Sequence, residues 1–213
     1  LLPDGTEIPG TNFDYNYLQH RKVDVVSSAL DFILPFEKYK ITAGAKVSFT
    51  NTRNGINYDT SDPTLVQDDY FRYKEQIYAL YADYSREYSE RFSMQLGLRM
   101  EHTRTTGISE AKDTEDKHDY TRLFPTVYLL YSPTDGHALN FSFSNRISRP
   151  SQNMVNPFPF YQNKYTYACG REDLKPSYTY NAELGYTLKN NFNVSAYYSY
   201  SDDVFFQVCG LGC

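Results

Sequence analysis

The sequence predicts an all-β protein, namely an antiparallel up-and-down transmembrane β-barrel segment of about eight long strands. The first observation is strict alternation, as in 139–144, where leucine and phenylalanine alternate with asparagine and serine. The second is that short and long connections alternate along the chain. The third is an excess of aromatic residues, with 22 tyrosines, 14 phenylalanines and no tryptophan among 213 residues. Each strand then has one apolar face for lipid and one polar face for a hydrated lumen.

Period-two alternation places the strands in order along the chain. In the second strand, isoleucine, alanine, valine and phenylalanine occupy the odd positions between 41 and 49. The fourth strand repeats the pattern with apolar residues at the even positions between 92 and 100. Alternation is less regular in the third strand around 77–81. The expected strands span about 22–34, 40–51, 70–86, 91–104, 120–132, 138–148, 177–189 and 192–208.

The connections between these strands alternate in length. Asp-Gly at 135–136 and Asn-Asn at 190–191 mark tight turns. Polar, turn-rich stretches predict three long extracellular-type loops at 52–69, 105–119 and 149–176. Outer-membrane barrels combine short periplasmic turns with long extracellular loops, whereas a soluble sandwich has no reason to collect its long loops at one end. The pattern therefore indicates that residues 1–213 form a single barrel segment.

Composition argues against two other classes of protein. The mean hydropathy of −0.62 and the lack of any run of about 18 apolar residues exclude a helical membrane protein. The net charge of −5 argues against nucleic-acid binding, which needs clustered cations to replace phosphate counterions. Three cysteines, Cys169, Cys209 and Cys213, are odd in number and lack metal-ligand spacing. Their role is not assigned by the sequence.

No catalytic, cofactor or metal site is expected, so the protein is not expected to be an enzyme. The four histidines are scattered along the chain, and a serine–histidine–acid set assembled among so many serines has little discriminating value. The acidic stretch 113–119 lacks the ligand spacing and turn glycine of a calcium loop. It is interpreted as a solvated acidic loop.

Charged residues within the strands must face away from lipid. A lysine or arginine facing hydrocarbon near the midplane costs about 2 to 4 kcal/mol. Alternation places Arg99, Arg146 and Glu183 on the lumen side, and Arg149 lies where the sixth strand enters the longest loop. These four are candidate ligand contacts in the lumen or at its mouth. The alternative is that these residues form a solvated wall without a ligand. In that case Arg146 and Arg149, where the sixth strand leaves for the longest loop, pair with Glu172, Asp173 or Glu183.

Several short motifs cluster around the longest loop. Asn-Arg-Ile-Ser-Arg-Pro-Ser at 145–151 ends a strand, Asn-Pro-Phe and Tyr-Thr-Tyr follow at 156–158 and 165–167, and Asp-Leu-Lys-Pro-Ser-Tyr at 173–178 opens the next strand. Together they resemble one region of TonB-dependent outer-membrane receptors, above all the outer-membrane β-barrel family abundant in Bacteroidetes. The resemblance covers about 21–207 and reaches motif level between 145 and 186.

The resemblance implies a barrel-wall portion of a nutrient transporter in the outer membrane of a Gram-negative bacterium. Members have about 22 strands around an N-terminal plug, so the chain looks like part of the C-terminal half of such a barrel. The implied partners are outer-membrane lipid, a plug domain, the TonB energising complex and an unidentified nutrient. The chain departs from the family at 209–213 (Cys-Gly-Leu-Gly-Cys), where further strands are expected.

Two alternatives belong to other functional classes. A stand-alone eight-stranded outer-membrane barrel, acting as an anchor or adhesin, predicts that the first and eighth strands pair. A soluble β-sandwich that binds carbohydrate through exposed tyrosines predicts a dry core between two sheets. A transporter segment instead predicts two open sheet edges.

Overall fold

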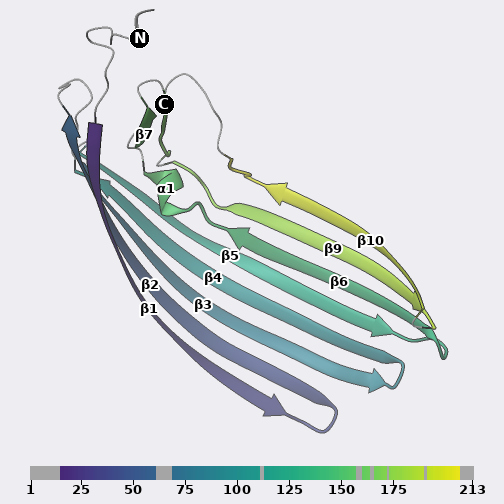
Figure 1. The fold of residues 1–213 in the computed structure, drawn as a ribbon. Coiled ribbons are helices and arrows are strands. Elements are labelled where there is room, and N and C mark those ends of the chain that lie inside the picture. Colours follow the sequence, from purple (N-terminus) through teal and green to yellow (C-terminus); the bar gives the residue numbers. More distant parts are fainter. Residues whose placement is uncertain are drawn as a thin grey trace, which may run out of the picture.

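The computed structural model describes residues 15–60, 69–110, 113–156, 160–163, 166–171, 173–189 and 191–206. Figure 1 shows one curved sheet, with a set of short hairpins at one end of the strands and the segment that contains α1 at the other. The elements are β1 (Tyr15–Pro35), β2 (Tyr39–Thr60), β3 (Asp69–Ser89), β4 (Phe92–Ser109), β5 (Thr114–Tyr131), β6 (His137–Ser148), α1 (Gln152–Val155), β7 (Phe160–Asn163), β8 (Thr166–Ala168), β9 (Ser177–Leu188) and β10 (Phe192–Asp202). Eight strands form one antiparallel sheet in the order β1-β2-β3-β4-β5-β6-β9-β10, and β7 pairs with β8.

The strands are longer than predicted at the end where the long loops were expected. β2 continues through 52–60, and β4 and β5 include 105–109 and 114–119. Most of the expected loop at 105–119 and half of the one at 52–69 were therefore wrong. Alternation of hydrophobicity disappears where both faces of a strand meet polar surroundings, so the sequence carries no period-two signal there.

β10 is shorter than predicted. It ends at Asp202 rather than near 208, because the next residue, Asp203, has a φ of 53°. A positive φ lies outside the extended region and interrupts the strand. Gly136, between β5 and β6, has a φ of 77°, which glycine adopts without a steric penalty in this predicted tight turn.

One face of the sheet is apolar and exposed. The register aligns Leu30, Ala45, Leu80, Met100 and Leu123 in one row across five strands. Further along the same face, the exposed fractions of Leu96 and Leu184 are 39% and 54%, so neither packs against a second protein layer among the described residues. We call this the lipid face, since exposing so broad an apolar surface to water would be unfavourable.

The opposite face, the lumen face, carries polar cross-strand contacts. The Tyr81 hydroxyl on β3 donates a hydrogen bond to Asp31 on β1. The ring passes over Gly44 on β2, where a Cβ atom would lie 2.5 Å from the ring carbon Cζ. Glycine is therefore required for this bridge across three strands. The polar alternate positions do face inward, as the sequence predicts.

The sheet is not closed. β1 and β10 are its two margins, and each has one paired neighbour among the described residues. The pairing of first and last strands expected for a stand-alone barrel is therefore not found in the described part of the chain. The layered core expected for a soluble sandwich is not found there either, since the second sheet is the small β7–β8 pair. Open margins match a portion of a larger barrel.

Candidate functional site: a strap against the lumen face

The connection between β6 and β9, which we call the strap (149–176, described except for 157–159, 164–165 and 172), packs against the sheet. It begins at Arg149, passes through α1 and the β7–β8 hairpin, and returns to β9 at Pro176. Buried side chains gather where the strap meets the sheet, and Phe71 on β3 is only 1% exposed. The prediction of a long loop here holds for its position, but the loop contains secondary structure.

Backbone hydrogen bonds close the strap on itself. The Gly170 amide donates to the Asn156 carbonyl (2.8 Å), and the Arg171 amide donates to the Met154 carbonyl (2.7 Å). A Cβ atom at Gly170 would lie 2.3 Å from the Met154 carbonyl oxygen, so this close approach requires glycine. Cys169, the preceding residue, is disulfide-bonded. Its partner lies outside the described residues.

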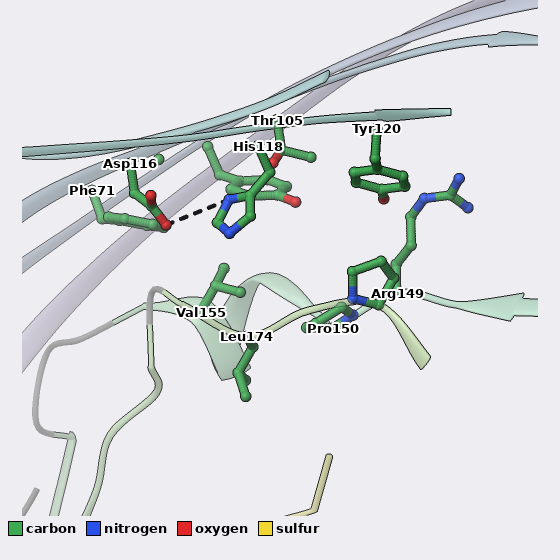
Figure 2. Close-up of a pocket in the computed structure, with 12 residues that line it drawn as sticks. Phe71, Thr105, Asp116, His118, Tyr120, Arg149, Pro150, Val155 and Leu174 are labelled. Carbon is green, nitrogen blue, oxygen red and sulfur yellow. Dashed lines mark ion pairs between the residues drawn. The ribbon is translucent and has the colours of Figure 1, made fainter. Parts of the chain in front are cut away.

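Figure 2 shows how the strap faces the strands. Phe71, Thr105, His118 and Tyr120 project from β3, β4 and β5 toward the strap, which presents Arg149, Pro150, Val155 and Leu174. The cavity between them measures about 30 Å³. That volume holds one or two water molecules. The interface between the strap and the lumen face is therefore a packed contact rather than a ligand-sized pocket.

Ion pairs anchor the start of the strap to the wall. The Arg149 guanidinium pairs with Glu101 on β4 and donates a hydrogen bond to the Thr103 hydroxyl at 3.1 Å. Its Nε lies 3.5 Å from Glu75 Oε1 on β3. Arg99 donates to the other Glu101 oxygen at 2.5 and 2.9 Å. Two arginines thus share one carboxylate that is only 4% exposed.

Burial sets the electrostatics of this cluster at the strap end of the strands. Positions 74, 104 and 119 on the opposite face are charged, so this part of the strands lies beyond the band that contacts lipid hydrocarbon. Desolvation raises the pKa of Glu75, while Arg149 opposes that shift. Desolvation likewise lowers the pKa of Arg149, and Glu75 opposes it. Burial, with a contribution from Glu75, raises the pKa of Tyr73 to about 12.

The structure brings together two of the four residues singled out from the sequence. Arg99 and Arg149 meet on Glu101, whereas Arg146 is exposed on β6 and Glu183 lies on β9, directly opposite Ser142. Arg149 pairs with Glu101 and Glu75, so its expected pairing with Asp173 or Glu183 was wrong. Glu172, the third expected partner, lies outside the described residues. Asp173 instead pairs with Arg171 at 2.6 Å.

Glu75 and Thr103 were not singled out from the sequence. The only signal for Glu75 was a charge within a strand of irregular alternation. The acidic stretch 113–119 is mostly strand, and its side chains divide between the two faces. Asp116 approaches His118 on the lumen side (3.5 Å), and Asp119 pairs with Arg104 on the lipid side (2.7 Å). Among the described residues, no group of three histidine, cysteine, aspartate or glutamate side chains is arranged to hold a metal ion.

No helix in the described part of the chain has the length and apolarity needed to cross a membrane. Solved structures with a similar fold include the copper transporter OprC (TM-score 0.63, 12% identity, 85% of this chain and 30% of that chain). A second is the ferric yersiniabactin uptake receptor FyuA from Yersinia pestis (TM-score 0.56, 17% identity, 89% of this chain and 30% of that chain). A third is the siderophore receptor PiuA from Acinetobacter baumannii (TM-score 0.56, 14% identity, 86% of this chain and 32% of that chain). No curated protein matches the chain.

The chain spans about a third or less of each of these receptors and transporters, and at such identities the likeness concerns the fold. The resemblance to TonB-dependent receptor barrels is confirmed at that level, while a Bacteroidetes origin stays a prediction. A family model described as the outer membrane protein beta-barrel family matches residues 2–209. The protein therefore belongs to the outer membrane protein β-barrel family and resides in the outer membrane.

Proposed function

We propose that this chain forms part of the wall of a TonB-dependent outer-membrane transporter that takes up a nutrient. One observation carries the proposal: the strap is held against the lumen face by buried ion pairs at Arg149. A purely anchoring wall has no need of an ordered segment inside its lumen. A transporter requires obstruction of the lumen when no substrate is moving, and large barrels achieve this with internal segments.

The four residues chosen from the sequence take two roles in this proposal. Arg99, Arg146 and Glu183 line the route of the nutrient along the lumen. Arg149 is the anchor of the strap, since it is paired with two carboxylates and not directed to solvent. Movement of the strap would free Glu75 and Glu101 to face the lumen. The nutrient route would then gain negative charge from these two carboxylates when the strap moves.

The remaining partners follow from the family resemblance. A plug domain would occupy the lumen, and the TonB complex would supply force from the inner membrane. Structural neighbours include a copper transporter, a ferric yersiniabactin uptake receptor and a siderophore receptor. Copper and ferric siderophores are therefore the first probes to test. The proposed role is transport and involves no catalytic step.

The test uses the full-length protein in its own bacterium. Uptake of radiolabelled ferric siderophores and of copper is compared between wild-type cells, a gene deletion and a complemented deletion. We expect deletion to abolish uptake of one probe class, complementation to restore it, and an uncoupler of the proton gradient to block it. Uptake unchanged by the deletion, together with loss of surface attachment, would overturn the proposal in favour of an anchor.

A further inference from the structure

A row of three cations crosses the lipid face at the strap end of the sheet. The register places Lys22 on β1 directly opposite Arg53 on β2, and Arg53 directly opposite Arg72 on β3. Arg72 lies between Phe71 and Tyr73, which face the strap, so alternation directs Arg72 to the other face. Like charges placed directly opposite one another destabilise a sheet unless an anion neutralises them.

The described neighbours supply little negative charge to this row. Lys22 pairs with the exposed Asp24 at 3.8 Å. Arg72 Nε donates to the neutral amide oxygen of Asn51 at 3.3 Å. Arg53 Nε is buried and has no hydrogen-bond partner. The row therefore retains excess positive charge, although the whole chain has a net charge of −5.

The position of the row relative to the bilayer indicates what it meets. Phe49 on β2 and Tyr78 on β3 pack edge to face on the lipid face, with ring centroids 5.8 Å apart, as in the aromatic girdles of membrane barrels. Arg53 lies roughly 13 Å farther along the strand at about 3.3 Å per residue. With a strand tilt of about 40°, this is about 10 Å in height. The row is therefore level with lipid headgroups.

We propose that Lys22, Arg53 and Arg72 bind the phosphate groups of a phosphorylated glycolipid in the outer leaflet. Guanidinium groups bind phosphate oxygens through parallel charge-assisted hydrogen bonds, and Lys22 adds a point charge at the margin of the row. Phosphate bound at the guanidinium groups neutralises and separates the like charges. The site faces lipid, so it is distinct from the route of the nutrient and does not depend on the proposed transport.

The test measures binding of bisphosphorylated lipid A to the full-length protein in detergent, with dephosphorylated lipid A and inorganic phosphate as parallel probes. We expect preference for the bisphosphorylated lipid. The double variant R53Q/R72Q should bind it at least about tenfold more weakly, since charge-assisted contacts are lost. Arg86→Gln is the matched control. Arg86 is also an arginine of the lipid face with a buried Nε, but it lies beside Tyr88 at the hairpin end.

Folding of each variant is verified by the heat-dependent shift of its electrophoretic mobility. If R53Q/R72Q does not fold, Lys22→Gln serves instead, because Lys22 is well exposed, and it too should weaken binding. The proposal is overturned by equal affinity for the two lipid A forms, by wild-type affinity in folded R53Q/R72Q or K22Q, or by an equal loss in R86Q. Binding of inorganic phosphate alone, with no binding of either lipid, also overturns it.

Discussion

Arg149 at the start of the strap is paired with Glu101 on β4, a residue 48 positions earlier in the chain. The contact joins the segment between β6 and β9 to a strand two places away in the sheet order. Arg99 shares the same carboxylate. Because Glu101 is almost fully buried, the pair contributes more to the position of the strap than a surface ion pair would.

Breaking this pair should release the strap. We expect Arg149→Ala to lower the free energy of local opening by about 1 to 3 kcal/mol, because it leaves the buried Glu101 carboxylate with one partner fewer while Arg99 remains paired with it. Hydrogen exchange of strap amides in the full-length protein measures the change. Asp173→Asn is the control, since it removes the exposed pair with Arg171 and should leave exchange nearly unchanged. Equal protection in both variants would contradict the anchoring role.

Gly170→Ala should disrupt the closure of the strap. The new Cβ would lie 2.3 Å from the Met154 carbonyl oxygen, which is backbone and cannot turn aside. We expect a cost of about 1 to 3 kcal/mol, as for other overpacked sites, seen as faster proteolysis of the strap. Gly107→Ala is the matched control, because its Cβ would meet only the Phe71 ring at 3.4 Å. Similar proteolysis rates in the two variants would show that the close approach is unimportant.

Alkaline pH should destabilise the strap end through Tyr73. Burial raises the pKa of Tyr73 from 10.0 to about 12, so its contribution is complete below pH 10. It is lost as pH rises through 12, because the unfolded state releases the proton first. The urea midpoint, followed by circular dichroism from pH 8 to 11, should fall less steeply in Tyr73→Phe than in wild type. The exposed Tyr200→Phe should follow wild type. Parallel curves for all three would refute this assignment.

A charge on the lipid face should be costly, whereas one on the lumen face should be tolerated. We expect Leu98→Arg to lower the free energy of unfolding from phospholipid vesicles by about 2 to 4 kcal/mol. Ser142→Arg should change it little, because Ser142 lies on the lumen face directly opposite Glu183. Urea titration in vesicles measures both. A larger loss for the lumen variant would reverse the assignment of the two faces.

Alternation was sufficient to predict the eight strands, their order and the face that meets lipid. Leu98 and Leu184 were assigned to lipid from their sequence positions, and both are exposed on that face. This worked because a strand places alternate side chains on opposite faces whatever its neighbours are. The same rule failed at 52–60 and 114–119, where polar residues occupy both faces and carry no periodic signal.

The partners of Arg149 depended on three-dimensional arrangement. Its position at the end of a strand was evident, but Glu75 and Glu101 lie on other strands, and their meeting depends on the register of β3 and β4 and on the inward fold of the strap. Register is a relation between strands, and a shift of one residue would turn both carboxylates toward lipid. The row of Lys22, Arg53 and Arg72 arises in the same way. Local alternation therefore determines which way a side chain points, and only the paired sheet decides which charges become neighbours.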